Sequence, residues 1–464
     1  MIPARMQSVL EEVRPLAEAF STAGQPLYLV GGVVRDLLLG RERPEGADLD
    51  LCTPAHPGEI KAIVAPLADA VWTQGERFGT IGLRIAGRDY EITTFRAESY
   101  EPDSRKPEVS FGDSIETDLS RRDFTVNAMA LAVPEPELLD PFGGAADLAA
   151  GLLRTPLDPE VSFVDDPLRM LRAARFIAGY GLEPTPELVE AVRANASRLE
   201  IVSAERIRDE LDKLLVTPDP SAGLWFAVDT GLADHFLPEL PAMRLEQDPI
   251  HHHKDVLAHT IAVVAKTKPE RTVRLAALLH DVGKPRTRDF GDGGVTFHHH
   301  EVVGARMARD RMKALRYSND HVEAVRLLVY LHLRFHTYKM GWTDAAVRRF
   351  VRDAGDHLPE LIDLTRSDCT TRNQRKAATL ARRMDELELR IAALREQEAL
   401  DAIRPDLDGQ AVMAHLGVGP GRHVGEALAY LLELRMDEGP LGEEEARRRL
   451  DAWWSQRIAS VDPG

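Results

Sequence analysis

The spacing of apolar residues changes character near residue 150 of this 464-residue chain. Before that point, short apolar runs bounded by glycine and proline predict strands at 27–30, 49–53, 80–85 and 89–95. After it, apolar residues recur at helical spacing almost to the end of the chain. A chain with this pattern is expected to be an α+β protein, with a small α/β head followed by a long all-α body.

The composition favours a cytoplasmic protein over a secreted or membrane protein. The two cysteines, Cys52 and Cys369, fit neither a disulfide framework nor a metal-type spacing. No run of about 18 apolar residues is present, and the residues after Met1 lack the pattern of a signal peptide. The net charge of −17 argues against indiscriminate nucleic-acid binding, although local basic clusters can still bind RNA.

A glycine pair and a pair of aspartates follow one another in the predicted head. Gly31 and Gly32 come directly after the first strand and begin a helix that contains Arg35. Backbone amides at such a helix start can hold phosphate groups. Asp48 and Asp50 lie one residue apart on the next strand, so their carboxylates share one face. Carboxylates together with phosphates suit Mg²⁺, and a pair of such ions indicates phosphoryl or nucleotidyl transfer.

A second polar segment, residues 121–128, offers groups that suit a nucleotide. Arg122 can fork onto phosphate or sugar oxygens, and an aspartate–arginine pair that includes Asp123 can grip ribose hydroxyls. Asn127 is the third residue of this segment that we expect at the site. Glu91, on a following strand, is the candidate for a third carboxylate beside the aspartate pair.

A charged series recurs at a spacing of three residues, and it consists of Asp166, Arg169, Arg172 and Arg175. At this spacing, side chains occupy neighbouring positions around a helix. Because an aspartate accepts hydrogen bonds and an arginine donates them, Asp166 with Arg169 can imitate a base edge and select C or A without a nucleic-acid template. Ordinary salt bridges on a solvated helix are the alternative interpretation.

Together these segments resemble motifs of bacterial tRNA nucleotidyltransferases (CCA-adding enzymes), a family shared with bacterial poly(A) polymerase. The resemblance covers nearly the whole chain, and three further segments carry it: Asp140 to Gly144, Asp165 to Phe176, and Ser203 to Leu211. It implies a head of the DNA polymerase beta superfamily, with Asp166 and Arg169 reading the base and Arg172 and Arg175 also binding nucleotide. At Asp165 the chain departs from the glutamate usual in the family, and the shorter side chain is expected to shift that contact.

The resemblance implies template-independent addition of C, C and A to the 3′ end of tRNA from CTP and ATP. A poly(A) polymerase, or an enzyme that adds only CC or only A, uses the same chemistry, and motifs do not separate these readily. An RNA-end-healing hydrolase and an inactive tRNA-binding protein are alternatives from other classes, and intact Asp48 and Asp50 argue against both. The expected partners are tRNA, ATP and CTP, without a membrane, and the oligomeric state is not predicted.

Histidines and aspartates in the helical part form a second candidate site, which consists of His259, His280, Asp281, His300, His332 and Asp368. Their order resembles the HD-type metal-dependent phosphohydrolase domain. That resemblance implies a divalent transition metal such as Ni²⁺, Mn²⁺ or Co²⁺, and 2′,3′-cyclic phosphodiesterase, 2′-nucleotidase or phosphatase activity. The extra histidines could support a second metal. The choice among His298, His299 and His300 stays open, with His300 favoured because a helix opens after it.

We expect four domains in chain order. They are a nucleotidyltransferase head at 1–150, a helical neck for base and RNA binding at 151–240, an HD domain at 241–385, and a helical tRNA-binding tail at 386–464. The segment at 97–114 reads as a mobile loop that, by resemblance, helps the switch from C to A. In the tail, a glycine-rich turn within 416–425 could bring backbone amides to RNA phosphates, or could simply cap a helix.

Overall fold

The computed structural model describes residues 4–41, 48–99, 108–112, 114–245, 255–291, 294–337, 343–369, 374–398 and 404–461. The chain divides into two compact units, Met1–Pro241 and Ala242–Gly464. The division falls beside the end predicted for the neck, while the four domain ranges themselves remain predictions. Among the described residues, no helix combines the length and the apolar character that crossing a membrane requires.

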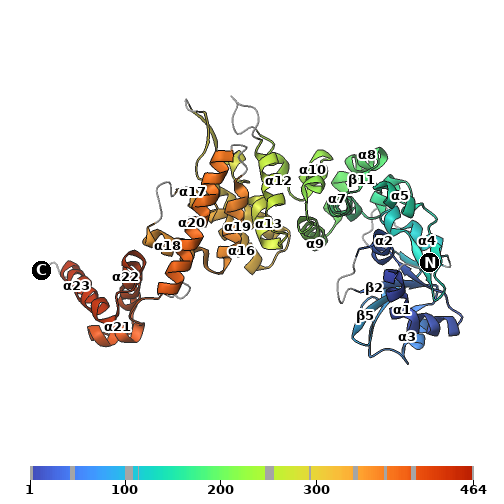
Figure 1. The fold of residues 1–464 in the computed structure, drawn as a ribbon, viewed down its shortest axis with the longest axis horizontal. Helices are drawn as coiled ribbons and strands as arrows, with labels where there is room; N and C mark the ends of the chain where they lie inside the picture. The colour runs from blue at the N-terminus through green and yellow to red at the C-terminus, as the bar shows by residue number, and fades with distance from the viewer. Residues whose placement is uncertain are drawn as a thin grey trace. The chain divides into compact units, whose positions relative to one another are not determined.

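The first unit contains a mixed sheet, drawn in blue and teal in Figure 1. Its strands are β1 (Leu27–Val30), β2 (Leu49–Thr53), β3 (Ala70–Trp72), β4 (Thr80–Ile85), β5 (Arg88–Thr94), β8 (Ala130–Val133) and β9 (Leu138–Leu139). They lie in the order β3-β4-β5-β2-β1-β8-β9. Only the β2–β5 pair is parallel, and the chain between these strands includes a helix, as a parallel crossover requires.

Helices make up most of the rest of the first unit. They are α1 (Ala4–Thr22), α2 (Gly32–Leu39), α3 (Pro57–Val64), α4 (Ile115–Ser120), α5 (Gly144–Ala150), α6 (Pro159–Asp165), α7 (Leu168–Tyr180), α8 (Pro186–Asn195), α9 (Ala204–Leu215) and α10 (Ser221–Asp229), with 3₁₀ turns η1 (Glu76–Phe78), η2 (Thr125–Asn127), η3 (Ala196–Ile201) and η4 (Leu232–His235). Local sequence sets their ends. The Ser203 hydroxyl accepts a hydrogen bond from the Arg206 amide at the start of α9, and Gly181 ends α7 in the left-handed conformation.

The second unit is almost entirely helical. After α11 (Glu239–Ala242) at the boundary, its helices are α12 (Val256–Lys266), α13 (Arg271–Leu279), α14 (Lys284–Thr287), α15 (His300–Ala314), α16 (Asn319–Leu331), α17 (Arg334–Thr337), α18 (Asp344–Ala354), α19 (Leu358–Asp368), α20 (Gln374–Glu398), α21 (Gly409–Leu416), α22 (Arg422–Glu438) and α23 (Glu443–Val461), with the 3₁₀ turn η5 (Gly355–His357). A mixed-sheet head followed by a helical body confirms the predicted α+β class.

Short strand pairs supplement these elements. The pairs are β6 (Arg96–Ser99) with β7 (Glu108–Phe111), β10 (Leu152–Leu153) with β11 (Glu183–Pro184), and β12 (Arg288–Gly291) with β13 (Gly294–Phe297). The prediction of a loop over 97–114 is therefore wrong at its two ends, which pair as β6 and β7. Residues 100–107 and 113 lie outside the described residues.

The core of the head lies directly behind the strand that carries the aspartates. Leu49 and Leu51 of β2 are buried, while Asp48 and Asp50 are exposed. The alternation follows from the period of two along a strand, and it directs both carboxylates to the side away from the core. Val30, at the end of β1, packs with Cys52 in a second apolar cluster, on the face of β2 that carries Asp50, so the glycine pair that follows is held near the carboxylates.

Candidate functional site

Three carboxylates gather where β2 lies beside β5 in the middle of the sheet. Asp50 of β2 lies opposite Glu91 of β5 in the parallel register, and Asp48 stands just before β2. Surrounding protein displaces water from Asp50 and raises the pKa of its carboxyl; Arg122 opposes this rise and Asp48 adds to it. The pKa of Glu91 is raised in the same way, by loss of water and then by Asp50 and Asp48. Three carboxylates this close together repel one another when ionised, and a bound cation would relieve that repulsion.

The glycine pair approaches Arg122 closely. Gly31 joins β1 to α2 with a φ of 71°, a conformation that glycine adopts without strain. A Cβ atom at Gly31 would lie 3.0 Å from Nη1 of Arg122. Arg122 also pairs with Asp118 at 3.1 Å, and its buried Nε atom has no hydrogen-bond partner among the described residues. An unpaired guanidinium N–H beside a glycine turn and a carboxylate cluster suits a phosphate group.

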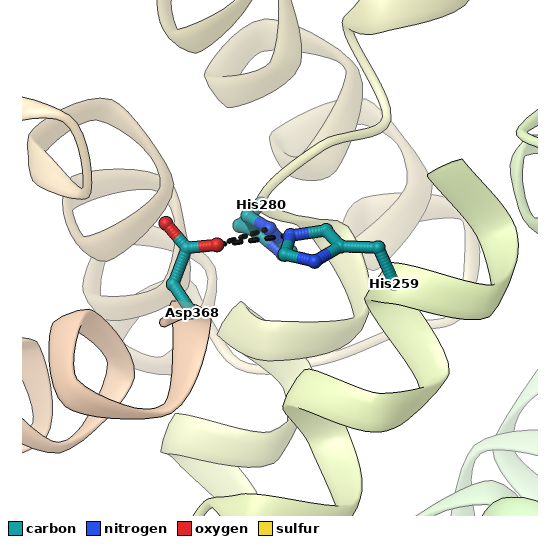
Figure 2. A group of neighbouring side chains, drawn as sticks. All are labelled: His259, His280 and Asp368. Carbon is teal, nitrogen blue, oxygen red and sulfur yellow. Dashed lines mark ion pairs between the residues drawn. The ribbon is translucent and has the colours of Figure 1, made fainter. Parts of the chain in front are cut away.

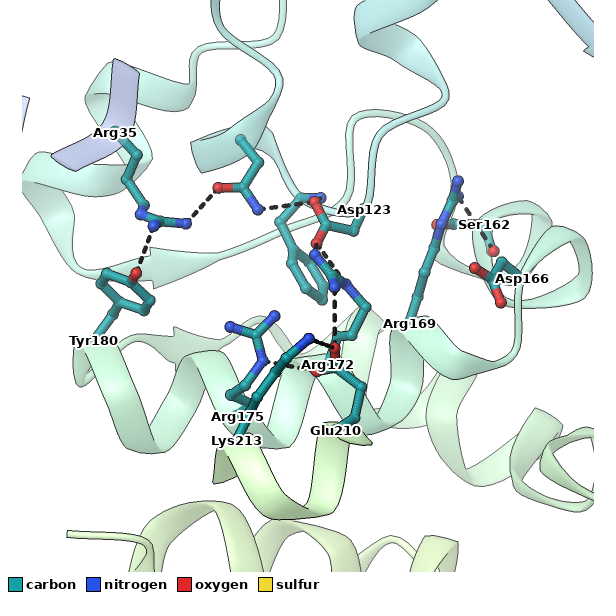
Figure 3. Close-up of polar contacts among 12 residues, drawn as sticks. Arg35, Asp123, Ser162, Asp166, Arg169, Arg172, Arg175, Tyr180, Glu210 and Lys213 are labelled. Carbon is teal, nitrogen blue, oxygen red and sulfur yellow. Dashed lines mark hydrogen bonds and ion pairs between the residues drawn. The ribbon is translucent and has the colours of Figure 1, made fainter. Parts of the chain in front are cut away.

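Asp123 and Asn127 are turned inward in the structure. Asp123 is 8% exposed, and its carboxylate receives hydrogen bonds from the Arg172 guanidinium and from the Asn127 side chain. Burial alone would raise the pKa of Asp123, but the charge of Arg172 and these hydrogen bonds lower it to about 2. Asn127 in turn accepts a hydrogen bond from Nη1 of Arg35 at 2.6 Å. Figure 3 shows this group, with Arg35 also reaching Tyr180 of α7.

The predicted base-reading residues lie side by side but do not share a helix. Asp166 lies in the turn between α6 and α7, with φ −137° and ψ 96°, and α7 begins only at Leu168. The expectation that all four charged residues occupy one helix is therefore wrong for Asp166, because Pro167 excludes the preceding residue from the helical conformation. Arg169 lies in the first turn of α7, beside Asp166 in Figure 3.

Both base-reading side chains have protein partners. Arg169 donates to the Ser162 hydroxyl at 2.8 Å and to the backbone carbonyl of Arg121. Asp166 accepts from Arg206 at 2.9 Å and from the Leu168 amide at 3.2 Å. These contacts use about half of the lone-pair sites of Asp166 and part of the N–H groups of Arg169, so both side chains can also contact a nucleotide.

The six predicted metal ligands come together in the second unit. Three lie in α12, α15 and α19 (His259, His300 and Asp368), and three directly follow α13 or α16 (His280, Asp281 and His332). Two sets of three have ligand atoms within 4.8 Å of one another: His259 with His280 and Asp368, and Asp281 with His300 and His332. Figure 2 shows the first set, in which Nε2 of His259 lies 2.9 Å from Oδ1 of Asp368. Asp281 faces both sets, since its Oδ2 lies 3.2 Å from Nε2 of His280 and its Oδ1 lies 3.4 Å from Nε2 of His300.

Three of the imidazoles are oriented as metal ligands would be. Nδ1 of His280, His300 and His332 each bonds the backbone carbonyl three residues earlier, at 2.7, 2.8 and 2.6 Å. A carbonyl only accepts, so Nδ1 must carry a proton, and Nε2 is the ring nitrogen left to bind a metal. Each of these Nε2 atoms is buried without a hydrogen-bond partner among the described residues. Orphaned nitrogens beside two carboxylates therefore fit a divalent metal.

The charges within this cluster oppose one another. Burial would lower the pKa of His280, but Asp281 and Asp368 raise it to about 10. Burial and the nearby charge of His280 lower the pKa of His332 to about 3. Burial likewise works against ionisation of Asp281, yet His280 and Lys284 hold its pKa well below the ordinary value. The carboxylates thus recruit positive charge, which a metal cation would supply.

The structure separates the three consecutive histidines. His300 is buried in the cluster, whereas His298 and His299 are exposed. His299 has a φ of 62°, a left-handed conformation that is uncommon for a residue other than glycine, and it stands at the start of α15. The turn it makes directs its neighbour His300 inward.

Sequence reasoning missed several polar residues that complete these sites. Glu210 is 3% exposed and accepts from Arg172 and Arg175, and Lys284 lies 2.6 Å from Asp281. A signal for Glu210 was present, because it sits on the buried face of α9 among leucines and isoleucine. A single charge on an apolar face indicates a buried ion pair. Nothing in the local pattern singles out Tyr180, the partner of Arg35.

Three segments of the chain match models of known protein families. Residues 27–154 match a model described as the poly(A) polymerase head domain, 181–243 match "probable RNA and SrmB-binding site of polymerase A", and 251–394 match the HD domain. An A-adding tRNA nucleotidyltransferase of Deinococcus radiodurans is 35% identical over 443 residues, which cover 92% of this chain and 95% of that protein. A CCA-adding enzyme of Limosilactobacillus reuteri is 40% identical over 229 residues, 49% of this chain and 55% of that enzyme.

Solved structures of CCA-adding enzymes are similar to this chain over nearly its whole length. The crystal structure of the Bacillus stearothermophilus CCA-adding enzyme in complex with CTP matches with a TM-score of 0.70 and 25% identity, over 99% of this chain and 100% of that one. A Thermotoga maritima CCA-adding enzyme complexed with tRNA matches with a TM-score of 0.58 and 21% identity, over 96% of both chains, and so shares the fold.

Proposed function

The chain belongs to the tRNA nucleotidyltransferase family, and we propose that it adds C, C and A in turn to the 3′ end of tRNA, with CTP and ATP as substrates, in the cytoplasm. The observation that carries the proposal is the cluster of Asp48, Asp50 and Glu91 beside the Gly31 turn. The family membership supplies the substrate class, and the cluster supplies the chemistry.

We assign the metal-binding role in the head to Asp48 and Asp50, with Glu91 as a third carboxylate. Their exposed, crowded carboxyl groups fit Mg²⁺, which prefers a few carboxylates together with substrate phosphates. Magnesium bound here would stabilise charge on the attacking 3′ hydroxyl and on the departing pyrophosphate. Gly31 and Gly32 present bare backbone to the triphosphate, and the Arg122 guanidinium, whose Nη1 atom lies beside Gly31, is placed to bind a phosphate oxygen.

Gly31 offers a test of the triphosphate site. Gly31→Ala should lower the rate of nucleotide addition by at least about tenfold, because the new Cβ would press on Nη1 of Arg122, 3.0 Å away. Gly24→Ala is the matched control, since Gly24 has the same φ of 71° but no atom within 4 Å of the added Cβ. Both variants should lose stability in thermal denaturation, and Gly31→Ala more than Gly24→Ala, because the ψ of −133° at Gly31 lies outside the left-handed region that alanine can enter. Equal activity of the two would count against a triphosphate at Gly31.

Base selection belongs, in this proposal, to Asp166 and Arg169. Asp166→Ala and Arg169→Ala should each weaken discrimination among CTP, ATP, UTP and GTP, by about 1–3 kcal/mol, more than they weaken triphosphate affinity. Competition assays with mixed nucleotides measure this ratio. Arg193→Ala, which breaks an exposed pair with Glu190, should leave the ratio unchanged. A slower variant with wild-type fidelity would contradict the role in base selection.

A second candidate is addition of the final A alone. One observation favours it: the Deinococcus relative that matches over nearly its full length is an A-adding enzyme. Three substrates separate the candidates, namely tRNA lacking CCA, tRNA ending in C, and tRNA ending in CC. A CCA-adding enzyme extends all three, an A-adding enzyme extends only the last with ATP, and a poly(A) polymerase continues beyond one A.

We also propose that the HD cluster binds a divalent transition metal, such as Ni²⁺, Mn²⁺ or Co²⁺, and hydrolyses phosphate esters at RNA or nucleotide ends. Its support is the set of orphaned Nε2 atoms of His280, His300 and His332 beside Asp281. A bound metal would supply an activated water molecule. Asp281, with one oxygen toward His280 and the other toward His300, would help to hold a metal in either set of ligands.

A further inference from the structure

The β12–β13 hairpin adjoins the HD cluster through Phe297, the last residue of β13. The Phe297 carbonyl accepts a hydrogen bond from Nδ1 of His300 at 2.8 Å. The Phe297 ring also lies beside Lys284, whose Nζ atom is 5.7 Å from the ring centroid and 2.6 Å from Oδ2 of Asp281. One end of the hairpin is therefore held against two of the candidate metal ligands.

One face of this hairpin combines aromatic rings with positive charge. In the antiparallel register, Arg288 lies opposite Phe297, and Phe290 lies opposite Val295. Directly opposite residues, and alternate residues along one strand, direct their side chains to the same face, so these four side chains share it. The Arg288 guanidinium accordingly lies over the Phe290 ring, 4.7 Å from its centroid. This face therefore continues outward from Lys284.

Phe290 is the most exposed aromatic side chain among the described residues, at 66%. Single exposed apolar side chains are common on protein surfaces and need no explanation by themselves. Phe290 differs because it ends a row of side chains that begins at the HD cluster. The other face of the hairpin carries Asp289 and Thr296, so the aromatic and cationic groups gather on one side only.

The order of groups along this row matches the order of groups in a nucleotide. Lys284 and Arg288 supply positive charge at the end near the cluster, and Phe290 lies two residues beyond Arg288, or about 7 Å further along β12. The two cations suit phosphate groups. An exposed aromatic ring suits a nucleobase, because stacking of a base on such a ring contributes to affinity whatever the base.

We propose that this face of the β12–β13 hairpin binds the nucleobase of the substrate that the HD cluster hydrolyses, with the base stacked on Phe290 and the phosphate beside Arg288 and Lys284. The inference rests on the proposed HD activity and names the part of the chain that recognises the base. Because every base has an aromatic face, the contact distinguishes nucleotides and RNA ends from phosphate esters without a base, and it discriminates little among bases.

Hydrolysis kinetics of the full-length protein with Mn²⁺ test the contact. Phe290→Ala should raise KM for adenosine 2′,3′-cyclic phosphate by about tenfold and keep kcat within about twofold, because stacking holds the base and not the reacting phosphate. Methyl riboside 2,3-cyclic phosphate, which lacks a base, should be hydrolysed equally by both proteins. Phe290→Trp should keep the wild-type KM, whereas Phe290→Leu should resemble Phe290→Ala, since only an aromatic ring stacks.

Phe78→Ala is the matched control. Phe78 is also exposed and also has an arginine over its ring, since Arg77 lies 4.4 Å from the ring centroid, but it belongs to the head. This variant should hydrolyse both substrates as wild type does. An unchanged KM for the cyclic nucleotide in Phe290→Ala, or an equal loss with both substrates, would overturn the proposal.

A second measurement does not depend on hydrolysis. 5-Iodouridine 3′-monophosphate, irradiated with the full-length protein, should form a cross-link in the peptide that contains Phe290, because a stacked iodouracil reacts with the ring beside it. Peptide mapping separates this site from the head, where the probe can also bind. The cross-link should be lost in Phe290→Ala and kept in Phe78→Ala, and its absence from residues 288–297 of the wild-type protein would refute the base contact.

The two measurements separate failure of this inference from failure of the proposed activity. Wild-type protein that cross-links at Phe290 but hydrolyses no cyclic nucleotide would refute the activity and support the base contact. Wild-type protein that hydrolyses cyclic nucleotides but forms no cross-link in the hairpin would support the activity and refute the base contact.

Discussion

Asp50→Asn is expected to slow nucleotide addition by about a thousandfold or more while tRNA binding stays close to wild type. The substitution keeps the size of the side chain and removes the negative charge nearest Glu91 on the neighbouring strand. A metal ligand that acts on developing charge contributes mainly in the transition state, so kcat should fall more than affinity. Single-turnover extension of tRNA measures the first quantity, and gel-shift titration measures the second.

The matched control is Asp89→Asn, two residues before Glu91 on the same strand. Asp89 pairs with Arg84 at the surface, so its loss should leave extension within about twofold of wild type. An Asp50→Asn protein with more than about a tenth of wild-type activity would remove the carboxylate cluster from the chemistry.

The second large effect is expected at the HD cluster. A double variant, His280→Ala with Asp281→Ala, should lose at least about a hundredfold in metal-dependent hydrolysis of 2′,3′-cyclic nucleotides and keep tRNA extension. These residues come from consecutive positions and contribute to both sets of ligands, so neither set stays complete. Hydrolysis with Mn²⁺, Ni²⁺ or Co²⁺ is measured beside extension, and circular dichroism checks that the variant is folded.

His298→Ala serves as the control, because His298 is exposed and lies outside both sets. Hydrolysis by this variant should equal that of wild type. Wild-type protein that hydrolyses nothing with any of the three metals would leave the HD cluster without the proposed activity. A folded double variant that no longer extends tRNA would show that the two reactions depend on each other.

Sequence alone was sufficient where one local rule decides. The period of two along a strand predicted that Asp48 and Asp50 share a side, and β2 has the predicted bounds. The loop expected over 97–114 was wrong where its residues pair as β6 and β7, because these strands are polar and lack the apolar alternation by which strands are recognised in a sequence. The choice of Glu91 became specific only through its register opposite Asp50.

Spacing misled the prediction at Asp166. Its distance of three residues from Arg169 suggested one helix, but Pro167 forces the chain out of helical conformation just before α7. The buried cluster around Asp123 was out of reach for another reason. Its members come from α2, η2, α7 and α9, and no local pattern states which acidic residue meets which arginine.

The hydrogen bonds that Arg169 and Asp166 make in the free protein affect how tightly an incoming nucleotide binds and how readily it is released. Where an incoming base displaces the Ser162 hydroxyl from Arg169 or the Arg206 guanidinium from Asp166, it gains only the difference between two sets of hydrogen bonds. A base that bonds to one of these side chains and not to the other leaves a polar group without a hydrogen bond, and it therefore binds more weakly. The site therefore combines high selectivity among bases with low affinity for each base. A base that has been joined to the RNA can then leave the site before the next nucleotide binds.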